Sequence, residues 1–199
     1  MCDKARIIYV RAARSRGYMT VGVERDGERV SLTVPEGIYS ELGSPRTGDS
    51  PEPECYRILL SEDEKYRASL YALRILSYAD NNLRTLIRKL CERGISRPVA
   101  EEVAEEMLSR GYVNEHDQLM RLIKREANEN LNGPRKIKPK LMARGYSGAD
   151  IDRAMHELCE TGEVDFELSR RRLVEKKLTR DATEEEIKKL LYKNGYSVC

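Results

Sequence analysis

The sequence lacks tryptophan, contains a single phenylalanine and has no long hydrophobic run. The scarcity of large apolar rings predicts an aliphatic core, and the eleven tyrosines are expected to be mostly amphipathic. The apolar run at residues 7–10 is too short for a membrane span or for the core of a signal peptide. We therefore expect no contact with a membrane and a location in the cytoplasm.

Cysteine is sparse and dispersed. The five cysteines lie at positions 2, 55, 91, 159 and 199 and form neither a CxxC motif nor a cluster with histidine, which argues against a zinc site. An odd, scattered set without a signal peptide indicates reduced thiols. Cys91 and Cys159 lie in helical stripes and are expected to be small core residues rather than nucleophiles.

The motifs of common enzymes are also missing. The sequence has no GxGxxG motif, no Walker loop and no pair of carboxylates spaced for acid–base catalysis. His116 and His156 have no nucleophile in a recognisable motif nearby, so we interpret both as surface residues of helices. The sequence predicts a protein that is not an enzyme and that has no cofactor and no metal.

Charged residues, in contrast, make up 35% of the chain, with 36 lysines and arginines against 34 aspartates and glutamates. So many charges in a periodic sequence predict exposed helices rather than one deep globule. The net charge of +2 permits contact with nucleic acid without requiring it.

Glycine marks an internal repeat. Gly94, Gly145 and Gly195 recur at intervals of 51 and 50 residues. Each follows an apolar helical stripe and is expected to take the left-handed conformation that ends a helix. We interpret these stops as hinges between helices of a repeated unit rather than as sites.

The N-terminal part has a different pattern. Residues 18–24 and 29–34 resemble two strands joined by an Asp26-Gly27 turn, and the second strand alternates so that one face is buried. A short helix at residues 36–42 is expected to follow, and residues 55–60 could form a further strand. This part is thus a small β module that packs on something else.

From Ser61, whose capping box is expected to begin a helix, the pattern is helical. One helix ends at Gly94, and the next begins after Ser96 and ends at Gly111. One repeat is therefore three helices, the first of which begins at Ser61.

In the second copy, Ser147 is expected to cap the third helix. Pro139 falls inside the second helix, so that helix either starts late, near Lys138, or is kinked. In the third copy Thr183 and Glu186 form a capping box, and a third helix is missing.

The fold class expected is mainly α, with tandem three-helix repeats in an elongated curved array and a small N-terminal β-hairpin module, α+β overall. The segments are a β-rich module at 1–60, repeats at 61–114 and 115–164, and a truncated repeat at 165–199.

Basic residues gather around the second helix of each repeat and on the first helix of the third copy. They are candidates for contact with a partner or with DNA: Arg84, Arg88, Lys89, Arg93, Arg135, Lys136, Lys138, Lys140, Arg144, Arg170, Arg171, Arg172, Lys176 and Lys177. One interpretation is a basic track for a polyanion or an acidic protein groove. The other is that they complete solvated helix faces; for residues 135–140 the two interpretations weigh equally.

The helical part contains four motifs in a fixed order: Ala-Leu-Arg-Ile-Leu at 72–76, Leu-Arg-x-x-Ile-x-x-Leu-x-x-Arg-Gly at 83–94, Leu-x-x-Gly-Tyr-Val-Asn-Glu at 108–115 and Gly-Pro-x-x-Ile-x-x-x-Leu-x-x-Arg-Gly at 133–145. In their order and spacing these motifs resemble the RecX family of RecA regulators. The resemblance implies a monomeric, non-enzymatic protein that binds the RecA filament along its groove. It also implies approach to single- or double-stranded DNA and inhibition of ATP hydrolysis, strand exchange and co-protease activity.

Two other classes remain open from the residues themselves. A DNA-binding transcriptional regulator would use helix-turn-helix-like units, although helices rich in glutamate, as at residues 101–106, would repel a phosphate backbone. A generic helical scaffold for another protein is the third possibility.

Overall fold

In the computed structural model, which describes residues 5–179 and 181–197, the chain divides into two compact units. The first comprises Met1–Ser77 and Ile87–Met107, and the second comprises Tyr78–Leu86 and Leu108–Cys199. The class is mainly α-helical with one small antiparallel sheet, which confirms the predicted class. None of the described helices is long and apolar enough to cross a membrane.

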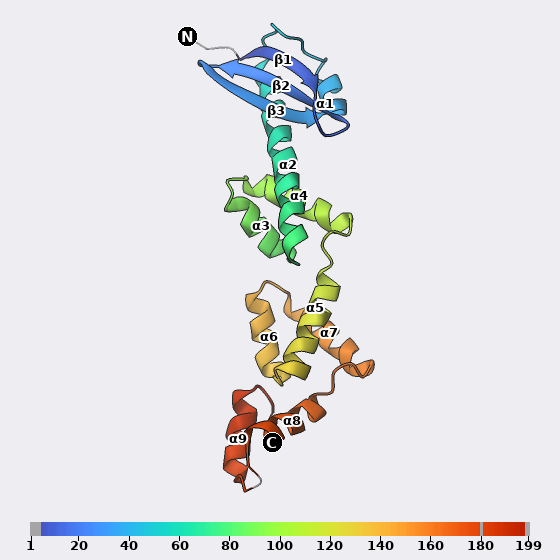
Figure 1. Ribbon diagram of the computed structural model, residues 1–199, viewed down its shortest axis with the longest axis vertical. Helices are drawn as coiled ribbons and strands as arrows, with labels where there is room; N and C mark the ends of the chain where they lie inside the picture. Colours follow the sequence, from blue (N-terminus) through green and yellow to red (C-terminus); the bar gives the residue numbers. More distant parts are fainter. Residues whose placement is uncertain (1–4, 180, 198–199) are drawn as a thin grey trace. The chain divides into compact units, whose positions relative to one another are not determined.

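The sheet of the first unit has the order β1-β2-β3 (Figure 1). Its strands are β1 (Arg6–Ala12), β2 (Tyr18–Arg25) and β3 (Glu28–Pro35). Asp26 and Gly27 both have positive φ, 53° and 81°, as a tight turn between β2 and β3 requires. The predicted hairpin of β2 and β3 is confirmed. β1 was not predicted, because the apolar run at residues 7–10 was considered only as a possible membrane span or signal peptide.

The apolar face of the sheet forms the core of this unit. Leu32 and Val34 of β3 are buried as the alternation predicted, whereas Val30 lies near the turn and is 37% exposed. α1 (Glu36–Glu41) follows the sheet and ends at Gly43, as expected.

α2 (Pro53–Tyr78) corrects two predictions, because residues 55–60 are not a strand and no helix begins at Ser61. The helix starts at Pro53, where the missing N–H costs no hydrogen bond. Leu59 is fully buried in the same core as the sheet. Asp63, two residues after Ser61, accepts a hydrogen bond from the backbone N–H of Thr33 at 2.8 Å. Contacts distant in sequence therefore decide this element.

α3 (Leu83–Cys91) and α4 (Arg97–Ser109) end at the predicted glycines, Gly94 and Gly111, both with positive φ. The division between the two units falls within α3, after Leu86.

The second unit continues with α5 (Glu115–Lys124) and the π-helical segment η1 (Arg125–Glu129). α6 (Pro134–Ala143) begins at Pro134, so the late start near Lys138 is wrong and Pro139 lies inside the helix. α7 (Gly148–Glu160) is capped by Ser147 as predicted. The core of this repeat is aliphatic: Leu119, Ile123, Ala127, Ile137, Leu141, Ile151, Ala154, Met155, Leu158 and Val164.

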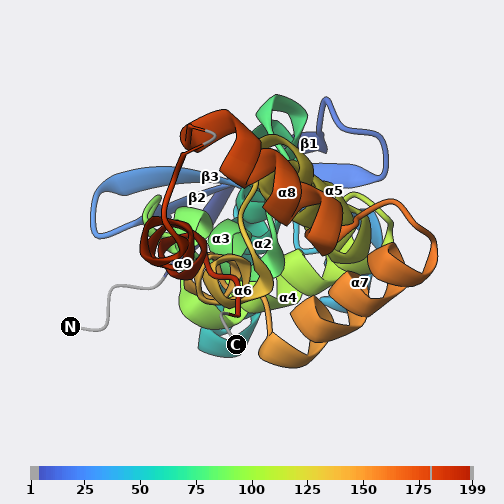
Figure 2. The same ribbon diagram turned by 90° about the horizontal axis from the view of Figure 1, so that it is seen from below.

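The last two helices of the described chain are α8 (Phe166–Lys177) and α9 (Glu184–Lys193). Thr183 and Glu186 form the predicted capping box at the start of α9. Figure 2 views α9 nearly end-on while α8 runs across the view, so the two helices cross. Leu173 of α8 and Leu191 of α9 share a buried cluster with Leu131 and Tyr196.

Candidate partner-binding site

The turn at Gly195, after α9, lies against the first turn of α6. The backbone N–H of Gly133 donates to the Asn194 carbonyl at 2.7 Å, and the N–H of Arg135 donates to the Gly195 carbonyl at 3.1 Å. Gly133 occupies the N-cap position of α6 and has no side chain that could accept a hydrogen bond there. No other described side chain caps this helix end. The two carbonyls therefore replace the N-cap that a serine or aspartate usually supplies.

The turn at Gly145 makes a similar contact with the first turn of α3. Asn82 Nδ2 donates to the Arg144 carbonyl at 2.7 Å, while Asn82 Oδ1 accepts from the Thr85 N–H at 2.9 Å. In both contacts one accepting carbonyl belongs to the residue before the stop glycine, Asn194 in the first and Arg144 in the second. The stops are thus more than the hinges we predicted, because two of them join a helix of one repeat to the next.

Gly145 and Gly195 are needed because each lies close to a neighbouring segment, as well as because each has a positive φ. A Cβ on Gly145 would lie 2.8 Å from Arg84 Cδ, and one on Gly195 would lie 2.4 Å from the backbone nitrogen of Lys136. By comparison, a Cβ on Gly94 or Gly162 would meet nothing within 4 Å.

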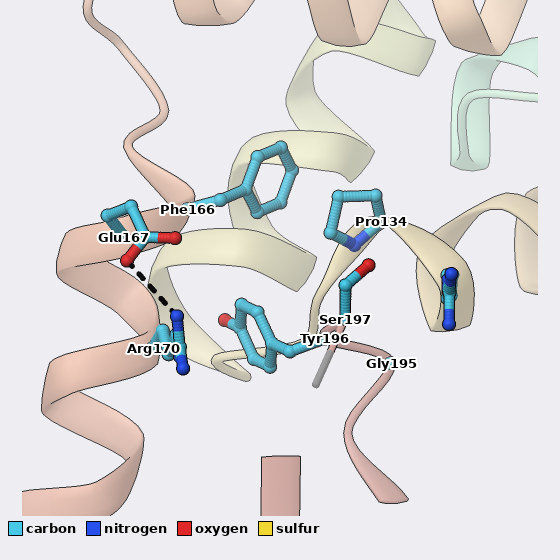
Figure 3. A pocket seen from close by; sticks show the side chains of 8 residues that line it. Pro134, Phe166, Glu167, Arg170, Gly195, Tyr196 and Ser197 are labelled. Carbon is cyan, nitrogen blue, oxygen red and sulfur yellow. Dashed lines mark ion pairs between the residues drawn. The ribbon is translucent and has the colours of Figure 1, made fainter. Parts of the chain in front are cut away.

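A cavity of about 190 Å³ lies beside the contact at Gly195. Its walls come from the start of α6, the start of α8 and the turn after α9. Figure 3 shows the rings of Phe166, Pro134 and Tyr196 and the Ser197 side chain around one space, with Glu167 and Arg170 to one side. Three segments far apart in the sequence therefore build one pocket.

The pocket combines aromatic rings with charged side chains. The Tyr196 hydroxyl donates to the Leu131 carbonyl at 3.2 Å, and burial raises the pKa of this phenol to about 12, so it stays neutral. The Arg170 guanidinium lies 3.5 Å from the Glu167 carboxylate. Arg135, which also lines the pocket, forms no side-chain ion pair or hydrogen bond with any described residue.

The other predicted cations of α6 are held by neighbours. Lys136 Nζ donates to Asn194 Oδ1 at 3.1 Å, and Lys138 Nζ lies 2.6 Å from Asp152 Oδ2. Lys140 Nζ lies 2.6 Å from Glu126 Oε1, and that glutamate is only 2% exposed.

Glu126 also accepts a hydrogen bond from Asn132 Nδ2 at 2.8 Å. Burial alone would raise the pKa of this carboxyl, but the hydrogen bonds from Lys140 and Asn132 outweigh it, so its pKa is lowered. The carboxylate therefore stays charged inside the second repeat, where it holds the end of the π-helical segment.

Four of the predicted cations of α8 form no ion pair with a described residue. Arg171, Arg172, Lys176 and Lys177 are exposed and make no ion pair within residues 5–179 and 181–197. Leu168 precedes Arg171 by three residues, so the two share a face of α8, and Leu168 is itself 42% exposed.

The predicted cations near α3 have different environments. Arg88 pairs with Glu92, and the Arg93 guanidinium stacks 5.2 Å from the Tyr71 ring centroid. Lys89 is half-buried. Arg84 packs against Gly145, the residue that follows Arg144. Arg135 and Arg170 both line the pocket.

Both histidines are exposed helix residues, as predicted: His116 lies 3.4 Å from Glu157 and His156 lies 3.2 Å from Glu160. Cys159 is exposed, so its predicted core position is wrong. It follows Leu158, the last buried residue of α7, on a side that no described element covers. Cys2 and Cys199 lie outside the described residues.

No group of three or more histidine, cysteine, aspartate or glutamate side chains in the described chain could hold a metal ion. The tyrosines that directly follow the helix-ending glycines differ in burial. Tyr196 is 5% exposed, whereas Tyr112 is 54% exposed.

The pocket residues Phe166, Glu167 and Ser197 were not among the candidates. One local signal existed, since Phe166 is the only phenylalanine and directly follows Asp165, the N-cap of α8. Nothing local links it to residues 195–197, which are brought to it by the fold.

No family model matches the sequence. Curated relatives are named "Regulatory protein RecX". One from Bacillus cytotoxicus is 24% identical over 70% of this chain and 51% of its own length, and one from Bacillus cereus is 24% identical over 82% and 60%. The chain therefore spans about half to three fifths of the length of these relatives.

Two solved structures share the fold. "Crystal structure of regulatory protein RecX" matches with a TM-score of 0.68 at 21% identity, over 97% of this chain and 95% of that one. RecX from Lactobacillus salivarius matches with a TM-score of 0.58 at 19% identity, over 68% and 90%. The two comparisons together support the RecX family, as the repeated motifs predicted.

Proposed function

We propose that this chain, similar to RecX proteins in sequence and in fold, is a non-enzymatic regulator that binds the RecA–DNA filament. The observation that carries the proposal is the fold match over 97% of the chain to a structure titled as regulatory protein RecX. The curated relatives are named as regulatory proteins too. The regulator acts in the cytoplasm as a monomer, lies along the filament groove, and lowers ATP hydrolysis, strand exchange and co-protease activity.

Among the basic residues, the free cations of α8 are the first choice for this contact. These are Arg171, Arg172, Lys176 and Lys177, which form no ion pair with a described acidic residue. A negatively charged partner can therefore contact them without an ion pair having to break first. Lys140 is a weaker choice because it neutralises the buried Glu126. The remaining candidates contribute to the contact through the charged ends of their side chains.

The test is the ATPase rate of RecA on single-stranded DNA, with RecA from the same organism. We expect the wild-type chain to lower the rate at substoichiometric amounts. A fourfold charge reversal at Arg171, Arg172, Lys176 and Lys177 should weaken this effect at least tenfold, because each exposed contact contributes about 0.5–1 kcal/mol.

The matched control is Lys188→Glu with Lys189→Glu on α9, whose lysines lie 3.7 and 3.9 Å from glutamates of the same helix. An unchanged ATPase rate with wild-type chain would refute the proposed function. Co-sedimentation with bare DNA but not with RecA filaments would instead favour the DNA-binding regulator.

A further inference from the structure

The pocket beside Gly195 has the composition of a protein-binding anchor. Aromatic side chains and arginine dominate the residues that contribute most to protein–protein affinity, and such residues gather around pockets. Phe166 and Tyr196 supply the rings, and Arg135 and Arg170 supply the charge. Because the Tyr196 hydroxyl is tied to the Leu131 carbonyl, its ring is already fixed before anything binds.

The cavity is smaller than a usual small-molecule site. Small-molecule sites have volumes of about 300–1,000 Å³, whereas this pocket holds about 190 Å³. A single apolar side chain of a partner fits such a space better than a cofactor or a nucleoside.

The charged residues around the pocket favour an acidic group next to the apolar side chain of the ligand. Two arginines against one glutamate leave a net positive mouth, and Arg135 has no acidic partner among the described residues. The Ser197 hydroxyl likewise makes no hydrogen bond with any described residue, so it can donate to a carboxylate. The Glu167 side chain is 70% exposed. Its negative charge would repel the many closely spaced phosphates of a nucleic acid more strongly than it would repel the single carboxylate of a peptide side chain.

We propose that this pocket binds an acidic peptide segment of a protein partner. An apolar side chain of the segment enters between Phe166 and Tyr196, and an adjacent carboxylate is held by Arg135 and Arg170. The proposal names a contact point for the filament-binding role and rests on that role for the source of the peptide. The exposed Leu168 and Arg171 would continue the contact along α8.

The direct test uses a peptide probe with two Phe-Glu pairs separated by glycine, titrated into ¹⁵N-labelled full chain. We expect saturable shifts of the Phe166, Tyr196 and Ser197 amides. Arg170→Ala should weaken binding at least tenfold, since hydrogen bonds to charged groups contribute about 1.5–3 kcal/mol. Glu167→Gln should strengthen it, because Arg170 is released from its ion pair.

Arg153→Ala is the matched control, since Arg153 also lies three residues after an acidic partner, at 3.6 Å from Asp150. It should bind the probe as the wild type does. The absence of saturable shifts at the pocket, or equal affinity of wild type and Arg170→Ala, would overturn the proposal. Tighter binding of an oligothymidine at the same amides would overturn it too, in favour of a nucleic-acid site.

Binding of the same variants to RecA filaments separates the two proposals. If the wild-type chain does not bind filaments but the peptide occupies the pocket, the filament-binding role fails and the pocket stands. If the chain binds filaments but the peptide does not occupy the pocket, the pocket proposal fails and the filament-binding role stands.

Discussion

Replacing Gly195 by alanine perturbs the contact between the last helix stop and α6 in two ways. Gly195 has φ of +83°, which costs an alanine about 1 kcal/mol. The added Cβ would also lie 2.4 Å from the Lys136 nitrogen and 2.5 Å from its Cβ. Backbone atoms cannot rotate away, so the turn must move off α6 and lose the hydrogen bonds of Gly133 and Arg135.

Two further glycines separate the effects. Gly162, in the same unit, has φ of +73° and open space around it, so Gly162→Ala carries the conformational cost alone. Gly133 has an ordinary φ of −82°, but its Cβ would lie 2.5 Å from the Gly195 carbonyl oxygen, so Gly133→Ala carries the steric cost alone.

We expect losses of about 1 kcal/mol for Gly162→Ala and about 2 kcal/mol for Gly133→Ala, from overpacking and weakened hydrogen bonds. Gly195→Ala should lose their sum, about 3 kcal/mol. Urea unfolding followed by circular dichroism measures these values, and each 1 kcal/mol lowers Tm by roughly 4 °C in a domain of about 100 residues. Equal losses for Gly195→Ala and Gly162→Ala would refute the reasoning, because the contact would then contribute nothing in solution.

Three other substitutions test separate parts of the structure. Lys140→Met should destabilise the protein by about 1–3 kcal/mol at pH 7, because it leaves Glu126 buried without its cation. The lowered pKa of Glu126 means that this loss should shrink as the pH falls below the ordinary value of 4.5, and equal losses at pH 7 and pH 3 would contradict the ion pair. Thr183→Ala should cost about 1 kcal/mol in the unfolding of α9, whereas no change would show that the capping box is dispensable. Gly22→Ala should cost about 1–3 kcal/mol, because its Cβ would lie 2.2 Å from the Tyr9 ring, and adding Tyr9→Ala should recover part of that loss in a thermal melt.

The features that could be predicted are those that few adjacent residues decide. Helix ends at Gly94, Gly145 and Gly195 and caps at Ser147 and Thr183 follow from local backbone chemistry, and all are present. The N-terminal half of α2 was missed because its role depends on distant partners. Leu59 is buried in the core of the sheet, and Asp63 accepts from Thr33, thirty residues earlier.

The candidate site was predicted less well than the fold, for a related reason. Sequence clusters of lysine and arginine carry no information about their acidic partners, so Lys140 and Arg171 looked alike. In the structure Lys140 meets the buried Glu126, fourteen residues away, while Arg171 meets no acidic residue in the described chain. The pocket needed three segments to be joined before its rings and charges could be seen as one site.

The capping of α6 by the carbonyls of Asn194 and Gly195 has a consequence for synthesis of the chain on the ribosome. The first turn of α6 is made about sixty residues before its cap, which at ~5–20 residues per second is a delay of roughly 3–12 s. During that interval the N–H groups of Gly133 and Arg135 have only water as a partner. The second repeat therefore acquires its final stability only when the third has emerged, so the two mature together although they are made in succession.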